Sequence, residues 1–158
     1  MFSGKSKHGL DDKNRVCIPK RFQNELGRNA EGHMEVILTR GTDGCLFLFS
    51  REGWKRIQER MALQPFGSPH LRGMQRVFLA STVETRLDGS GRLVLPEEQR
   101  ELAGIQNEVV LVGVGDRAEV WSPERWEAFE SGFSESFDEF CGILMDGAEP
   151  PGQGAQIG

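Results

Sequence analysis

The sequence predicts an α+β protein built from a folding unit that occurs twice. The stretch from Leu10 to Pro19 reads Leu-Asp-x-x-x-Arg, three apolar residues and Pro, and this pattern returns 77 positions later, from Leu87 to Pro96. A second match, between residues 49–54 and 121–126, repeats an aromatic residue, Ser, Glu and Trp at the same spacing. Short strand and helix patterns alternate within each copy, which favours the α+β class.

Each copy begins with a strand, a tight loop and a second strand. Gly91 suits a loop position with a positive φ angle, and Asn14, in the equivalent place, is the residue other than Gly that best accepts this conformation. We therefore expect the two loops to share one shape. The segments are 7–10, 11–15 and 16–18 in the first copy, and 83–87, 88–91 and 92–95 in the second.

After each Pro the sequence predicts a short helix, then a pair of apolar strands, then a helix start. Ser50 and Ser122 are suited to cap the helices that follow, and Trp54 and Trp126 are expected to face the interior. The short helices are 20–26 and 97–103, and the strand pairs are 35–39 with 45–49 and 108–112 with 118–121.

Two helices, over 50–63 and 68–81, are expected to connect the copies, and a last helix to run from Pro123 to about Met145. The last helix carries aromatic residues at three- and four-residue intervals, a stripe more typical of a core or an interface than of a ligand site. The organisation expected is a first copy over 1–50, a helical connector over 51–81, a second copy over 82–122, a C-terminal helix over 123–146 and a disordered tail over 147–158.

Composition excludes several classes of protein. No stretch approaches the roughly 18 apolar residues of a membrane span, and the N-terminus lacks the apolar core of a secretory signal, so we expect a cytoplasmic protein without a membrane partner. The three cysteines are far apart and are interpreted as small core residues. The three histidines have no His or Cys at ligand spacing, so neither a metal nor a cofactor is expected.

Charge is distributed unevenly along the chain. The net charge is −5, yet residues 1–80 hold 14 Lys and Arg against 8 Asp and Glu, whereas residues 81–158 hold 5 against 16. Because salt screens charges beyond about 10 Å, a basic face in the first half can bind a polyanion although the whole chain is acidic.

These features together resemble the MraZ family of bacterial transcriptional regulators. The features are Met1-Phe2-x-Gly4, the doubled Leu-Asp-x-x-x-Arg motif, Met74-Gln75-Arg76 before Phe78-Leu79, and Asp88-Gly89-Ser90-Gly91-Arg92. The resemblance covers the chain from Met1 to about Phe140. It implies two tandem swapped-hairpin β units of the SpoVT/AbrB type, subunits that form a homo-oligomeric ring, and location at the nucleoid. It also implies binding to double-stranded DNA at short direct repeats in the promoter of the division and cell-wall gene cluster, with no small-molecule substrate.

Two departures from the family pattern concern the loops. The first loop has Asn14 where the family commonly has Gly, and the second copy lacks the basic flanks of the first. We therefore expect the first loop to bind DNA, and the acidic second copy to lie elsewhere on the ring. The basic residues and their second-copy equivalents are Lys5 and Thr82, Lys7 and Glu84, Lys13 and Ser90, Lys20 and Glu97, and Arg21 and Glu98.

Arg15 is the expected base-contacting residue, because Arg can donate two hydrogen bonds to guanine. Contacts with phosphate are expected from the other basic residues, Lys13, Lys5, Lys7, Lys20 and Arg21. An Asp four residues before an Arg can instead simply close a turn, and we favour this structural role for Asp11, Asp88 and Arg92, with Asn14 and Gly91 shaping the loops.

Two other functions are alternatives to DNA binding. A ring-forming structural protein would bind a protein partner through its acidic face and would show no preference among DNA sequences. An enzyme is not expected, because the sequence has no Gly-rich phosphate loop, no nucleophile elbow and no carboxylate pair with a credible base.

Overall fold

The computed structural model describes residues 1–65 and 67–147. It divides into two compact units, Met1–Arg125 and Trp126–Gly158, and each is described by itself. Apart from Gly147, the tail expected over 147–158 lies outside the described residues. No described helix is both long enough and apolar enough to cross a membrane.

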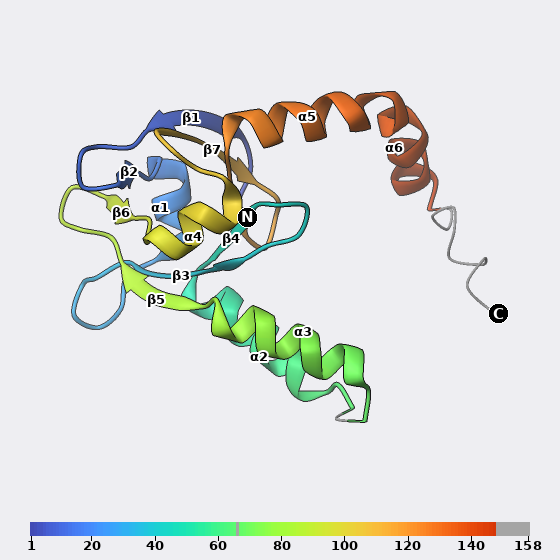
Figure 1. The fold of residues 1–158 in the computed structure, drawn as a ribbon, viewed down its shortest axis with the longest axis horizontal. Helices are drawn as coiled ribbons and strands as arrows, with labels where there is room; N and C mark the ends of the chain where they lie inside the picture. The colour runs from blue at the N-terminus through green and yellow to red at the C-terminus, as the bar shows by residue number, and fades with distance from the viewer. Residues whose placement is uncertain (66, 148–158) are drawn as a thin grey trace. The chain divides into compact units, whose positions relative to one another are not determined.

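The first unit has the strands and short helices that the sequence predicts, and the α+β class is confirmed (Figure 1). Helix α2 runs away from the sheet and α3 returns to it (Figure 1). The elements are β1 (Lys5–Gly9), β2 (Arg15–Cys17), α1 (Lys20–Leu26), β3 (Glu35–Arg40), β4 (Leu46–Phe49), α2 (Arg51–Ala62), α3 (Pro69–Ala80), β5 (Val83–Arg86), β6 (Arg92–Val94), α4 (Glu97–Ala103), β7 (Glu108–Gly113) and β8 (Ala118–Trp121).

The strands of the two copies are interleaved. A six-stranded antiparallel sheet has the order β1-β7-β8-β4-β3-β5, and β2 pairs with β6 in a separate two-stranded ribbon. β1 therefore does not pair with β2 across its own loop but with β7 of the other copy, and β5 pairs with β3. Exchanging the copies leaves this strand order unchanged, as expected for swapped hairpins within one chain.

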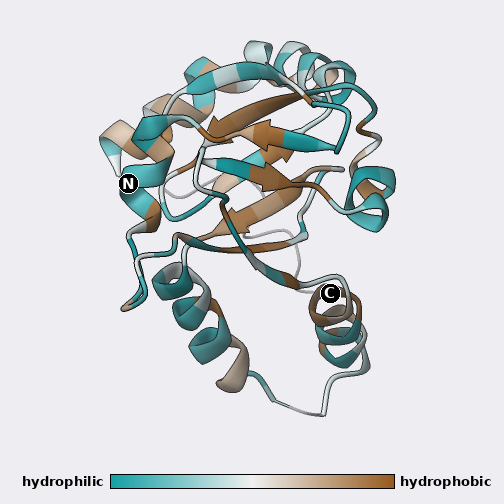
Figure 2. Ribbon diagram, turned by 90° about the vertical axis from the view of Figure 1, so that its left-hand side faces the viewer, coloured by the Kyte–Doolittle hydropathy of each residue, from teal (hydrophilic) through white to brown (hydrophobic). Residues whose placement is uncertain are grey.

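The ribbon of β2 and β6 has one buried and one outward face. Val16 lies opposite Leu93 in the register, and both side chains are fully buried in the main core. Because side chains alternate along a strand, Arg15 and Cys17 point the other way. The expectation that all cysteines are core residues is therefore wrong for Cys17, which is exposed, although Cys45 is buried. Figure 2 shows that hydrophobic residues concentrate on the strands.

The predicted caps are present at both helix starts after the strand pairs. The Ser50 hydroxyl accepts a hydrogen bond from the Gly53 backbone N–H at 3.0 Å, and the Ser122 hydroxyl accepts one from that of Arg125 at 3.2 Å. Trp54 is buried as predicted, whereas Trp126 is only half-buried.

The C-terminal helix is broken, whereas the sequence predicted one continuous helix. It consists of α5 (Pro123–Phe133), which starts in the first unit, a 3₁₀ turn (Ser134–Ser136) and α6 (Phe137–Asp146). The Ser134 hydroxyl donates to the Ser131 carbonyl at 3.0 Å. Serines next to Gly132 are poor helix formers because their side chains compete for backbone groups, which accounts for the break.

Gly91 gives a stability test of the second loop. Its φ is +76°, and a Cβ added there would lie 2.3 Å from Nε2 of the buried Gln23. We expect Gly91→Ala to lower the free energy of unfolding by about 1–2 kcal/mol, measured by urea denaturation. Gly89→Ala is the matched control, because nothing lies within 4 Å of an added Cβ and φ is not positive. Equal losses from the two variants would contradict this account.

Candidate nucleic-acid interface

The carboxylate of Asp11 organises the first loop. Its Oδ1 accepts hydrogen bonds from the backbone N–H groups of Lys13 and Arg15, each at 2.9 Å, and its Oδ2 accepts one from Nε of Arg15 at 2.7 Å. The Asp11 backbone N–H also donates to the carbonyl of Arg15 at 3.0 Å. The loop is therefore closed by the side chain of Asp11 together with backbone hydrogen bonds of the same residue.

Asp88 organises the second loop in the same way. Its Oδ1 accepts from the backbone N–H groups of Ser90 and Arg92 at 2.9 and 3.0 Å, and its Oδ2 from Nε of Arg92 at 2.9 Å. The φ angles of Asn14 and Gly91 are 57° and 76°, both left-handed. The two loops thus share one backbone shape, although only the second has Gly at this position.

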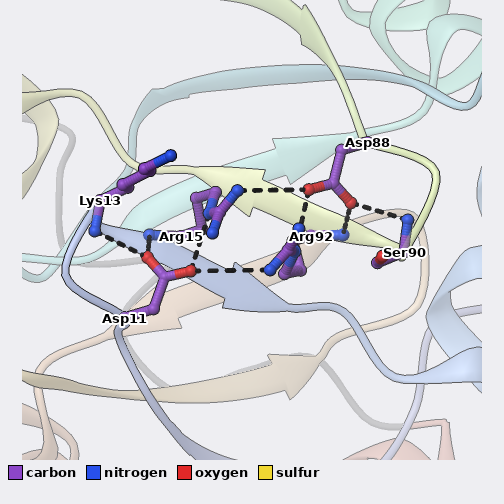
Figure 3. A network of polar contacts seen from close by, with 6 residues as sticks. All are labelled: Asp11, Lys13, Arg15, Asp88, Ser90 and Arg92. Atoms are coloured by element: carbon purple, nitrogen blue, oxygen red, sulfur yellow. Dashed lines mark hydrogen bonds and ion pairs between the residues drawn. The ribbon is translucent and has the colours of Figure 1, made fainter.

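The two loops lie side by side, as Figure 3 shows, and the arginine of each loop forms an ion pair with the aspartate of the other. Nη1 of Arg15 is 4.0 Å from Oδ2 of Asp88, and Nη1 of Arg92 is 3.9 Å from Oδ2 of Asp11. The pairing of β2 with β6 causes this proximity, because each loop leads directly into one of these strands. The expectation that the second copy lies elsewhere is therefore wrong.

Backbone bonds also join each loop to the other copy. The N–H of Ile18 donates to the carbonyl of Gly91 at 3.0 Å, and that of Leu95 to the carbonyl of Asn14 at 2.9 Å. The two loops are thus parts of one structure with approximate twofold symmetry.

Arg15 and Arg92 make equivalent contacts within their loops. Their side chains are 23% and 32% exposed, and each guanidinium donates through Nε to the Asp of its own loop. The turn-closing contact that the sequence analysis favoured for Arg92 is thus made by Arg15 as well. Both side chains remain open to a ligand on the outward face of the ribbon.

The other basic residues fall into two groups. Lys13 is exposed in the first loop, and the exposed Lys20 and Arg21 begin α1, directly after β2. Arg21 donates to the Ser3 carbonyl and the Ser6 hydroxyl at 3.2 and 3.3 Å.

Lys5 and Lys7 lie on the face of β1 opposite to Ser6, because side chains alternate along the strand. Nζ of Lys7 is 3.2 Å from a carboxylate oxygen of Glu108. The structure therefore separates these two lysines from Arg21, with which the sequence analysis grouped them.

Two supporting residues were missed in the sequence. Nε2 of Gln23 donates to the carbonyl of Ile18 at 2.8 Å, and Nε of Arg100 donates to that of Leu95 at 3.0 Å. The 77-residue offset relates each donor and each acceptor, so the repeat contained a signal for this pair. Because Gln and Arg differ chemically, the equivalence of Gln23 and Arg100 is not evident from the sequence.

Hydrogen bonding lowers the pKa of both loop carboxyls. The backbone N–H of Arg15 is the main cause for Asp11, and that of Arg92 for Asp88; the guanidinium of the same Arg adds to each effect. Both carboxylates therefore stay charged at neutral pH. Among the described residues, no group of three His, Cys, Asp or Glu side chains could hold a metal ion.

Comparison with known proteins identifies relatives along most of the chain. A family model described as "MraZ protein, putative antitoxin-like" matches twice, over residues 1–77 and 78–140. Proteins named transcriptional regulator MraZ are similar to the chain: that of Carboxydothermus hydrogenoformans is 40% identical and that of Syntrophomonas wolfei 36% identical, each over 146 residues. Both alignments cover 92% of this chain and 98% of the relative.

The lowered pKa of Asp88 predicts a pH dependence of stability. A folded-state pKa below the unfolded value of about 4 stabilises the fold above that pH, and the stabilisation is lost as the pH falls through the folded-state pKa. Asp88→Asn should therefore lower the melting temperature at pH 7 and have a smaller effect at pH 2–3. Thermal unfolding followed by circular dichroism across this range measures both effects, with the exposed Asp12→Asn as control. A loss for Asp88→Asn that is the same at every pH would rule out the ionised carboxylate as its cause.

Proposed function

The chain belongs to the MraZ family, and on that premise we propose that it is a transcription regulator that binds duplex DNA through the outward face of the β2–β6 ribbon. In this proposal its binding sites are short direct repeats in the promoter of the division and cell-wall gene cluster. Its subunits form a homo-oligomeric ring, and it is located at the nucleoid. The relatives' names describe regulators and not enzymes, in agreement with the sequence analysis.

The observation that carries the proposal is the paired arrangement of Arg15 and Arg92. Each Nε is held by a carboxylate at 2.7 or 2.9 Å, which fixes the plane of the guanidinium before any ligand binds. Such preorganisation lowers the entropic cost of binding. The terminal amino groups then supply the two donors that match O6 and N7 of guanine.

Charge favours the first copy as the main contact. Lys13, Lys20 and Arg21 accompany Arg15, whereas Ser90, Glu97 and Glu98 hold the corresponding places near Arg92. Phosphates are attracted to the first group and repelled by the acidic residues of the second. We assign base contact to Arg15 and phosphate contact to Lys13, Lys20 and Arg21. Lys5 and Lys7, on the other face of β1, would reach phosphates only at a separate position.

A ring would present many copies of this face at fixed separations. Engaging several direct repeats at once raises avidity by roughly 10² to 10⁴ without new contacts. Such avidity would let an acidic protein with few basic residues per subunit bind its promoter.

Selection of DNA from a random duplex pool, followed by sequencing, tests the function itself. We expect enrichment of a short sequence in tandem copies, and an affinity that falls linearly with the logarithm of salt concentration. A pool without enrichment would instead favour a protein that acts as a scaffold for other proteins.

Variants of the selected complex test the residue roles by gel-shift titration. Arg15→Ala should weaken binding to the selected fragment about 10-fold or more but leave binding to scrambled DNA nearly unchanged. Lys13→Ala should weaken both equally and reduce the salt slope by about 1. Lys55→Ala, in α2, is the matched control. Equal losses from Arg15→Ala and Arg92→Ala would refute the assignment to the first copy.

A further inference from the structure

The outward face of the β2–β6 ribbon carries apolar side chains as well as arginines. Four side chains alternate with the buried residues of the two strands and point outward: Arg15 and Cys17 on β2, and Arg92 and Val94 on β6. Cys17 is exposed, and Val94 is 49% exposed. The face that the proposed function assigns to DNA is therefore partly apolar.

Val94 lies directly opposite Arg15 in the antiparallel register. The adjacent pair is joined by a hydrogen bond from the N–H of Leu95 to the carbonyl of Asn14. Because such bonds alternate along an antiparallel ladder, the pair of Arg15 and Val94 has none of its own. In pairs of this kind the opposite side chains lie closest, with Cβ atoms roughly 4.5–5.5 Å apart. An apolar side chain of the second copy thus lies beside the arginine of the first.

The bases differ in the groups that they present in the major groove of DNA. Guanine presents the O6 and N7 acceptors, which match the donors of Arg15, and thymine presents its C5 methyl group. Val94 has no side-chain donor or acceptor and can distinguish bases only by apolar contact. A methyl group is the feature of the groove that suits such a side chain.

We propose that Val94 contacts the C5 methyl group of a thymine close to the guanine that Arg15 binds, and so is a second determinant of DNA sequence. This inference rests on the proposed function and deepens it, because it names a second base that the ribbon recognises. Successive base pairs are about 3.4 Å apart, so the thymine lies within about two base pairs of the guanine.

The equivalent residue of the first copy, Cys17, is less suited to this role. It lies opposite Arg92, to which the proposed function assigns no base contact. It also has a single thiol where Val94 has two methyl groups. The recognition site therefore combines Arg15 of the first copy with Val94 of the second, and neither copy contains both parts.

Replacing single thymines of the selected duplex by uracil tests the contact, because uracil lacks only the C5 methyl group. We expect one such replacement, made in every repeat, to weaken wild-type binding at least about fourfold in gel-shift titrations, as the loss of one buried methyl group implies. Replacing guanines by 7-deazaguanine, which lacks the N7 acceptor, locates the guanine in question. This change should weaken binding by the wild type but not by Arg15→Ala.

Variants of Val94 connect the thymine with this side chain. Val94→Ala should bind the thymine and uracil duplexes equally, whereas Val94→Ile, which keeps an apolar β-branched side chain, should retain the preference for thymine. Val114→Ala is the matched control, because it makes the same change at a valine that is 38% exposed in the β7–β8 turn. It should show the wild-type preference.

Each variant is judged by the ratio of its two affinities. A partly unfolded variant loses affinity for both duplexes equally and keeps the wild-type ratio, so it is not mistaken for a lost contact. Equal wild-type binding to every uracil duplex, or a thymine preference that Val94→Ala retains, would overturn the inference. The duplex is still bound in both cases, so the proposed function would stand. A chain that binds no duplex would overturn the proposed function, and this inference with it.

Discussion

The antiparallel pairing of β2 with β6 is the contact on which the rest of the first unit depends. Each strand has three residues, too few to be stable alone, yet the central pair, Val16 and Leu93, is fully buried in the main core. Their burial directs Arg15 and Arg92 to the outside and brings two loops together that are 77 residues apart in the sequence. A one-residue slip of either strand would turn the arginine of that strand into the core.

Symmetry of the backbone and asymmetry of the charge have different origins. Hydrogen bonds from Asp11 and Asp88 fix both loops in one shape, so each copy keeps an Asp, an Arg and a residue that accepts a positive φ. Positions that make no such bond are free to differ, and Lys20 and Glu97 begin equivalent helices with opposite charges. One fold thereby presents two chemically different ends of a single face.

Two of the aromatic clusters among the described residues also differ in character. Trp54 packs against Phe49 and Phe78 with centroid distances of 5.7 Å and is buried within the first unit. The rings of α5 and α6 stack on one another but remain partly exposed. The same Ser-x-Glu-x-Trp pattern begins both helices, so the local sequence sets the cap and the helix start, while the surroundings decide whether the Trp is buried.

The sequence alone determined the duplication, the α+β class, most strand and helix segments, and the common shape of the loops, because repeats, alternation and caps are local properties of the chain. It did not determine that β1 pairs with β7, that Cys17 is exposed, or that Asp88 lies 4.0 Å from Arg15. Strand partners depend on which arrangement buries the apolar faces of both copies at once, a condition on the whole chain that no local pattern contains. The reciprocal Asp–Arg contacts are therefore a product of tertiary structure, built from residues that the sequence had already marked.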